Sequence, residues 1–572
     1  MSKIENRLTG ELSVTLKGFG FVDIPNQDAD IFIPKDNLNG AVDGDIVEIR
    51  FKKKKFNGHP EAEVVHIVSH NTKTMDMATI MKKYNLSDDF PSAVINEAQK
   101  VVNLNLDDCM DNRRDFRDLP VITIDPADAR DLDDAVSLVE NNDGTMTLGV
   151  HIADVSEYVT EGSELDKEAY RRGTSVYFPD RVIPMLPTQL SNGVCSLNPD
   201  EPRLTLSVMM TLDKFYNIID YKIKKSVIQS VTRFSYDEVQ EILDGKKHKH
   251  RAMIMKMSEI AQKHEHDRRL RGEVAFQVPE PKIVLDENGQ IKDVYSQPHN
   301  LSHRIIETFM IMTNEVVAEH FNKLNLPFVY RVHDKPDPLK VIRFLNTLTP
   351  FEVKQKIDFE NPDGHHYQAM LDGITDPNLK TIVSILALRS MQKAKYSPNC
   401  IGHFGLGSTY YCHFTSPIRR YPDLLIHRII KMFLDSKLNS HKIEELNDFV
   451  VEASEQCSQT ELSAVEAERE VDNLKRAEYM HAHLGETFKG VVNGITDFGV
   501  FVYIPENTAE GLVRIDNLPA DSYSFNENTM QMIGKKSKIR MGDPMVVTVI
   551  GVNLRRCKIE FSANCDQNTD NI

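Results

Sequence analysis

Hydrophobic and polar residues alternate at both ends of the chain. Near the N-terminus this two-residue period covers four short stretches, residues 10–16, 19–24, 30–34 and 45–51. Residues 485–562 return to the same period in five further stretches. Side chains of a strand point alternately to its two faces, so short alternating segments separated by turn residues predict a small β-barrel at each end of the chain.

The pattern between the two barrels is mixed. Helical periodicity is found over residues 75–84, 92–102, 303–321 and 441–481. The apolar run 119–125 predicts a strand ending on Asp125, and residues 135–139 and 146–155 around Asn142-Asp143-Gly144 predict a hairpin. We therefore expect an α+β multidomain fold, with the boundaries 1–60 (barrel), 61–118 (connecting helical segment), 119–480 (central body), 481–565 (second barrel) and 566–572 (short tail).

Composition narrows the class of protein. Of 572 residues, 41% are hydrophobic and 27% charged, which is ordinary for a globular chain. No apolar run is long enough to cross a bilayer, the N-terminal residues lack a signal-peptide core, and the seven cysteines show no zinc spacing. No Walker or dinucleotide-binding motif is present, so ATP and NAD chemistry are not indicated. We expect a cytoplasmic protein with no membrane partner.

Taken alone, the net charge of −17 argues against a nucleic-acid partner. However, residues 1–60 carry nine basic and nine acidic residues, and residues 485–562 also carry nine of each. The acidic excess thus lies in the central body, where a channel lined with arginine would not alter the sign of the total.

Four aspartates lie within ten residues of the central body: Asp125, Asp131, Asp133 and Asp134. The predicted strands place them in a loop of the core, where carboxylates this close repel one another unless a cation neutralises them. Oxygen ligands favour Mg²⁺, with Mn²⁺ as a substitute. The alternatives are a solvated acidic turn and a calcium loop, and the calcium loop would need a glycine at its bend and a final glutamate, both missing here.

Five long motifs accompany the aspartates: GVHIADV (149–155), GTSVYFPDRVIPMLP (173–187), LSNGVCSLNP (190–199), GHFGL (402–406) and FTSPIRRYPD (414–423). With them, residues 8–562 resemble the ribonuclease II/ribonuclease R (RNB) family of 3′→5′ exoribonucleases, and its ribonuclease R branch more closely. Relatives in that branch usually have two N-terminal cold-shock barrels, whereas this chain has one.

The resemblance implies a processive, monomeric hydrolase that shortens RNA from single-stranded 3′ ends, including rRNA and mRNA decay substrates and structured RNA, and releases nucleoside 5′-monophosphates. Two metal ions would be held by the four aspartates, and Arg419 would contact the scissile phosphate. Further residues are expected at the RNA: Tyr177 stacked on the terminal base, Glu307 and Asn314 on one face of a helix, Arg420, and Glu468 near the 3′ end.

The barrels resemble cold-shock and S1 RNA-binding domains. Phe19, Phe21 and Phe32 are expected to form an exposed platform for stacked bases, each base contributing roughly 1–3 kcal/mol; the alternative is that they fill the barrel. In the second barrel the stacking face is expected from Phe488, Phe498 and Phe501.

His333 is followed by Lys335-Pro336, where an aromatic would complete a two-sided base clamp, so we interpret it as a structural or channel-lining histidine. Two other functions remain open. One is a catalytically silent RNA-binding protein of the same fold, such as a translational regulator, which should lack a carboxylate. The other is a single-strand-binding protein built on the barrels, which leaves the central residues unexplained.

Overall fold

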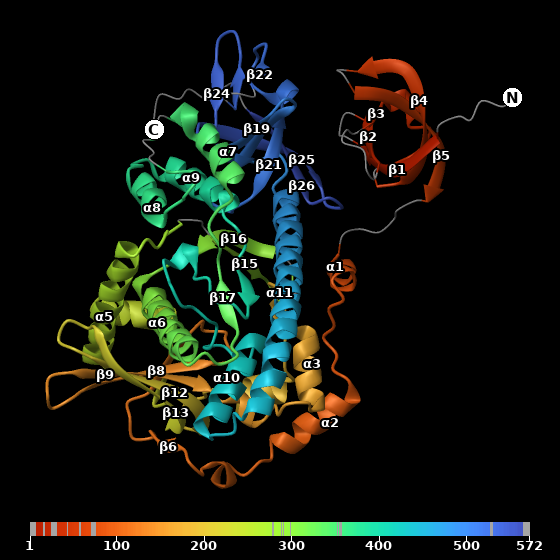
Figure 1. The fold of residues 1–572 in the computed structure, drawn as a ribbon. Helices are drawn as coiled ribbons and strands as arrows, with labels where there is room; N and C mark the ends of the chain where they lie inside the picture. The colour runs from red at the N-terminus through yellow and green to blue at the C-terminus, as the bar shows by residue number, and fades with distance from the viewer. Residues whose placement is uncertain are drawn as a thin grey trace.

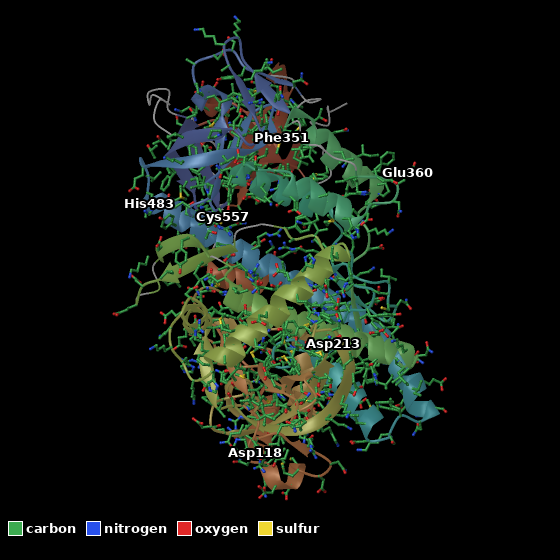
Figure 2. The ribbon with its side chains drawn as sticks, turned by 90° about the vertical axis from the view of Figure 1, so that its left-hand side faces the viewer. Asp118, Asp213, Phe351, Glu360, His483 and Cys557 are labelled. Carbon is green, nitrogen blue, oxygen red and sulfur yellow. The ribbon has the colours of Figure 1, made fainter. Side chains whose placement is uncertain are left out.

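The computed structural model describes residues 7–14, 18–24, 31–42, 44–56, 59–69, 76–276, 280–287, 289, 291–297, 299–351, 353, 357–526 and 530–563. The expected tail 566–572 lies outside these ranges. A sheet-based body occupies one end of the molecule and a β-barrel the other, with the N-terminal barrel to the side (Figure 1). The loop around Asp118 marks the far end of the body (Figure 2).

The N-terminal barrel is closed in the order β1-β2-β3-β5-β4. Its strands are β1 (Arg7–Val14), β2 (Gly20–Asp23), β3 (Ile31–Ile33), β4 (Ile46–Phe56) and β5 (His59–Ser69). Leu12, Val22 and Ile49 are fully buried inside it. The fifth strand corrects the expected boundary at residue 60, because a cut there would leave β3 and β4 without the strand that joins them.

The connecting segment is helical, as predicted, and contains α1 (Met77–Lys83) and α2 (Ser92–Val101). Helix α1 is fastened to the long helix α11 (Ser440–Ala482), where Tyr84 donates a hydrogen bond to Glu470 at 3.0 Å. Helix α2 meets α3 (Glu164–Arg172), where Glu97 accepts a bond from the Leu165 amide. The segment therefore attaches the barrel to the body.

A seven-stranded sheet forms the base of the body, in the order β14-β7-β8-β9-β12-β13-β6. Its strands are β6 (Arg114–Asp115), β7 (Ile122–Asp125), β8 (Asp134–Glu140), β9 (Met146–Ala153), β12 (Pro202–Leu212), β13 (Ile218–Gln229) and β14 (Thr232–Ser235). The predicted strand ending on Asp125 and the hairpin after it are confirmed. The last six residues of β9 are all buried, so both faces of the sheet are covered.

Helices complete the body: α4 (Tyr236–Leu243), α5 (Arg251–Leu270), α6 (Leu301–Lys323), α10 (Tyr421–Leu434) and α11. The two predicted helices over 303–321 and 441–481 are confirmed as α6 and α11. With 43 residues, α11 is about 65 Å long and runs from the body to the C-terminal barrel (Figure 1). None of the helices in the described ranges combines the length and the apolar character needed to span a membrane.

Three helices form a separate unit within the expected body: α7 (Pro338–Leu348), α8 (Gly364–Asp372) and α9 (Pro377–Ser390). They enclose their own core around Phe344, Tyr367 and Val383. Phe351 and Leu379 from this unit lie against Gly542 of the C-terminal barrel (Figure 2). Short strands complete the chain: β10 (Val176–Tyr177), β11 (Val182–Ile183), β15 (Glu280–Leu285), β16 (Ile291–Gln297), β17 (Tyr330–Val332) and β18 (Lys395–Ser397).

The C-terminal barrel is closed in the order β19-β20-β21-β26-β25, which confirms the five predicted strands. They are β19 (Thr487–Thr496), β20 (Gly499–Tyr503), β21 (Glu510–Arg514), β25 (Pro544–Asn553) and β26 (Lys558–Ala563). The periodicity did not predict the small sheet inserted between β21 and β25, made of β22 (Ser524–Asn526), β23 (Gln531–Ile533) and β24 (Lys538–Arg540).

Candidate active site

The loop that carries the aspartates is held from two sides. On one side, Arg233 of β14 directs its Nη2 at the carbonyl oxygens of Pro126, Ala127 and Ala129, at 3.4, 3.2 and 2.6 Å. On the other side, the Ser196 hydroxyl accepts a bond from the Leu132 amide at 3.1 Å and donates one to the Arg130 carbonyl at 2.8 Å. Sequence reasoning did not identify these two clamps, because one depends on strand pairing and the other on a serine 64 to 66 residues further along the chain.

For three carboxylates of this loop, burial outweighs the positive charge of the nearby arginines. Burial, followed by the charge of Asp134, raises the pKa of Asp125 to about 8. Burial also raises the pKa of Asp134 to about 6 and the pKa of Asp133 well above its ordinary value. In the described structure, one buried carboxylate oxygen each of Asp125 and Asp133 has no hydrogen-bond partner. Together these features favour either protonation or a bound cation.

The donor chemistry fits a hard divalent ion, because carboxylate oxygens are the ligands that Mg²⁺ and Mn²⁺ prefer. Within the described ranges, however, no three Asp, Glu, His or Cys side chains lie close enough together to hold a metal ion as they stand. The buried oxygens of Asp125 and Asp133 that accept no hydrogen bond, and the raised pKa values of Asp125, Asp133 and Asp134, are therefore the features that fit an ion.

The segment 414–423 brings arginine to the aspartates. The Ile418 amide donates to Asp133 at 2.8 Å, and Arg419 Nε lies 3.7 Å from the other oxygen of that carboxylate. The Arg419 side chain is 41% exposed and makes one further bond, to the Ser416 hydroxyl. Its guanidinium therefore has donors left for a ligand above the carboxylates.

Arg420 is held by a buried acid of its own segment. Its guanidinium forms a two-pronged ion pair with Asp423, at 2.9 and 2.7 Å, and Asp423 is fully buried. The same carboxylate accepts a bond from the Ser416 amide at 2.7 Å. Arg420 thus fixes the turn that presents Arg419, and its expected contact with RNA stays a prediction.

Tyr177 and Glu468 meet at the aspartates, although 291 residues separate them. The Tyr177 hydroxyl donates to Asp131 at 2.9 Å, and its amide donates to Glu468 at 2.8 Å. The ring is 38% exposed, and burial raises the pKa of Glu468. The hairpin β10–β11 and helix α11 therefore present a partly open aromatic beside the acid loop.

The two polar residues predicted on α6 have different environments. Glu307 is about half exposed, and its carboxylate lies 3.7 Å from His299. Asn314 is only 2% exposed, donates to the Tyr411 hydroxyl at 3.3 Å and accepts from the Phe414 amide at 2.9 Å. Asn314 therefore anchors the segment that leads to Arg419, and the expected contact with RNA is corrected.

Tyr236 is a neighbour of the site that the sequence did not reveal. It follows β14 directly, and its ring stacks on His303 of α6 with centroids 4.0 Å apart. Burial, followed by the charges of Asp134 and Asp125, raises the pKa of its phenol. Only the parallel pairing of β14 with β7 brings this tyrosine to the acids, so no local sequence signal marks it.

His333 is structural, as interpreted from the sequence. Its Nδ1 accepts a bond from the Gly405 amide at 3.0 Å, so Nε2 carries the proton and donates to the Gln392 carbonyl at 2.9 Å. It borders a cavity of about 750 Å³ that is also lined by residues 361–364 and 400–404. That cavity does not include the acid loop.

The aromatic residues of the barrels are only partly exposed. Phe19, Phe21 and Phe32 form one cluster with ring centroids 5.6–5.9 Å apart, but Phe32 is only 6% exposed, which corrects its expected place on an open platform. In the second barrel Phe498 is 49% exposed and lies edge-on to Phe501. In the described structure the ring of Phe488 contacts His483 and not the pair Phe498–Phe501.

Two small closed barrels are joined to a body in which a partly exposed arginine lies beside an acid loop. This architecture is typical of multidomain nucleic-acid-binding proteins. Comparison with known families gives the same division: an RNB domain over residues 113–436, a ribonuclease B OB domain over 10–67 and an S1 RNA-binding domain over 482–564. The chain therefore belongs to the RNB family.

Individual relatives support this assignment. The ribonuclease R of Thermotoga maritima is 40% identical over 559 residues, which cover 95% of this chain and 78% of the relative. The structure of Mycoplasma genitalium RNase R in complex with ribose-methylated single-stranded RNA superposes with a TM-score of 0.80 at 26% identity, covering 97% of this chain and all of the other.

The fold also occurs in a protein that is described by another term than nuclease. Yeast Ssd1, described as a pseudonuclease, has a TM-score of 0.63 at 19% identity, covering 92% of this chain and 81% of the other. At that identity the likeness concerns the fold alone, so activity must be argued from the residues of the site.

Proposed function

We propose that the protein is a metal-dependent 3′→5′ exoribonuclease that releases nucleoside 5′-monophosphates from RNA. The observation that carries the proposal is the loop of four aspartates next to the partly exposed guanidinium of Arg419. In this loop the pKa values of Asp125, Asp133 and Asp134 are raised, and one buried oxygen each of Asp125 and Asp133 accepts no hydrogen bond. All four carboxylates are present, which favours an enzyme over a silent RNA-binding protein.

Asp125, Asp131, Asp133 and Asp134 would hold two divalent ions, Mg²⁺ by preference, with Mn²⁺ as a substitute. When bound, such ions supply an activated water and offset negative charge on the phosphate. Arg419 adds a planar, permanently charged donor, which suits phosphate oxygens better than a lysine ammonium does. The bonds from Arg233 and Ser196 to the backbone of the loop would keep the aspartates in place while the phosphodiester bond is cut.

The exposed ring of Tyr177 offers a stacking surface for the terminal base. Its hydroxyl bond to Asp131 and its amide bond to Glu468 fix the ring relative to the acids. A base stacked there would set the distance between the last phosphate and Arg419, so that one nucleotide is removed in each cycle. Glu307, Phe19, Phe21, Phe498 and Phe501 would contact the RNA further from the cut. We expect a monomer acting in the cytoplasm.

The proposal is tested with a 5′-labelled single-stranded RNA incubated with the purified protein, with Mg²⁺ or with EDTA. The expected result is stepwise shortening and release of nucleoside 5′-monophosphate only with the metal. The Arg419→Lys variant should retain RNA binding and lose most of the rate. Binding without any release in Mg²⁺ or Mn²⁺ would favour the silent RNA-binding alternative.

Structured RNA is the second part of the proposal. A duplex with a 3′ single-stranded overhang should be shortened past the duplex boundary, because each hydrolysis step can capture a base pair that has opened transiently. Arrest at the boundary, with normal digestion of the overhang, would restrict the activity to single strands.

A further inference from the structure

The small sheet β22–β24 carries a lysine-rich turn that the site described above does not use. The turn joins β23 to β24 and reads Gly534-Lys535-Lys536-Ser537-Lys538. All three lysines are exposed, and none forms an ion pair with an acid in the described part of the chain. Figure 1 shows the sheet at the outer end of the C-terminal barrel, beyond the end of α11.

The turn is rigid, although it is exposed. One carboxylate, that of Asp521, accepts bonds from the amides of Lys535, Lys536 and Ser537 at 2.9, 2.8 and 3.1 Å. These bonds hold the pKa of Asp521 below its usual range. A β-carbon on Gly534 would lie 2.2 Å from the same carboxylate, so only glycine allows the approach. The Asp521 carboxylate is thus taken up by backbone N–H groups, and no ion pair joins it to the three lysines in the described structure.

The sheet is also fixed to the barrel. Met532 of β23 is fully buried and Ile539 of β24 is 6% exposed, and both belong to the hydrophobic core of the barrel. Phe525 of β22 packs against the same core. The backbone that carries the three lysines is therefore held in place relative to the C-terminal barrel, which lowers the entropic cost of binding several phosphates at once.

A fixed group of three positive charges on a chain of net charge −17 fits a polyanion with regularly spaced charges. We propose that the turn 534–538 is a contact site for the phosphate backbone of the RNA on the 5′ side of the segment held by the body. The proposal rests on the proposed function, because the RNA must extend from the body past the C-terminal barrel. The lysines then hold long substrates and contribute nothing to short ones.

The test compares the salt dependence of RNA binding for the wild-type protein and a K535S/K536S/K538S variant. Each phosphate contact on a single strand contributes about 0.7 to the slope of log K against log salt, so the loss of three contacts lowers the slope by about 2. Over a rise from about 50 to about 200 mM salt, the wild-type protein should lose about 16-fold more affinity than the variant. Binding is measured without metal, to prevent digestion, on an RNA of about 30 nucleotides.

Two control variants separate site from total charge. K246S/K247S/K249S removes three lysines from Gly245-Lys246-Lys247-His248-Lys249, a similar sequence in the loop between α4 and α5, and should keep the wild-type slope. K535R/K536R/K538R keeps the charges and should restore the slope. An RNA of about four nucleotides, the lower end of what one OB fold holds, should bind wild type and K535S/K536S/K538S equally.

An unchanged slope on the long RNA for K535S/K536S/K538S, or an equal loss for the control in the α4–α5 loop, would overturn the proposal. So would an equal effect on the short RNA. The proposed exoribonuclease activity fails separately: if the slope changes as expected and no monophosphate is released with metal, the lysine site stands and the catalytic assignment falls.

Discussion

Replacing Asp134 with asparagine should make the metal-free protein more stable and the enzyme inactive. Asn has the size of Asp but no charge, so it removes the electrostatic cost of the acid loop together with a proposed metal ligand. The pKa of Asp134 rises from 3.8 to about 6 on folding. That rise of about 2 units corresponds to up to about 3 kcal/mol lost by the wild-type protein once the group is ionised.

The sign of the pH dependence follows from the raised pKa. Below pH 3.8 the carboxyl is protonated in both the folded and the unfolded chain, and no stability is lost. The loss grows between pH 3.8 and about 6 and is complete above that range. The gain in free energy of unfolding for Asp134→Asn should therefore be largest near pH 7.5 and absent near pH 3.5.

The assay is urea unfolding of the body in EDTA and in Mg²⁺, at both pH values, with RNA hydrolysis measured in parallel. In EDTA at pH 7.5 the variant should be the more stable protein. In Mg²⁺ the order should move toward the wild type, because a ligand present at about 100 times its Kd stabilises the folded state by about 2.7 kcal/mol. Equal stabilisation of both proteins by Mg²⁺, or no gain for the variant in EDTA, would refute the reasoning.

Three further predictions address other parts of the structure. Arg233→Met should free the backbone of residues 126–129 and weaken Mn²⁺ binding by about 10-fold, the equivalent of one charge-assisted hydrogen bond. Titration calorimetry measures the binding, and Arg233→Lys should recover part of the lost affinity. Unchanged binding in Arg233→Met would mean that the clamp is dispensable. Asp154 is fully buried between Lys431 and Arg113, which hold its pKa below 3.8 despite burial. Asp154→Asn should therefore lower the free energy of unfolding in urea by about 3–5 kcal/mol above that pH. The difference from the wild-type protein should shrink as the pH falls below 3.8. RNA and DNA oligonucleotides of matched sequence should differ at least about 100-fold in cleavage rate, and Glu307→Ala should narrow the gap; equal rates for the wild-type protein would contradict recognition of the 2′-hydroxyl.

The sequence by itself determined most of the architecture. Alternating residues located the five strands of the C-terminal barrel, four of the five strands of the N-terminal barrel and the hairpin after Asp125, because a strand with one buried face must place its apolar residues at every second position. Helical periodicity likewise located α6 and α11. The aspartates and Arg419 were found because their chemistry is concentrated in short motifs.

The environment of each polar side chain required the tertiary structure. Arg419 and Arg420 are adjacent in sequence, yet one reaches the carboxylates with free donors and the other is held by the buried Asp423. Asn314 lies seven residues after Glu307 on the same helix, but the segment carrying Phe414 covers it. Burial depends on what packs against a residue from distant parts of the chain, and no local pattern encodes that.

The same reason explains the residues that the sequence did not reveal. Tyr236, Arg233 and Ser196 reach the acid loop through the pairing of β14 with β7 and through the loop around residue 196, which are contacts between segments far apart in the chain. The lysine turn of β22–β24 has an ordinary surface composition. Its fixed form results from the bonds of three successive backbone amides to Asp521 and from the packing of the small sheet on the barrel core, and this arrangement exists only in the folded protein.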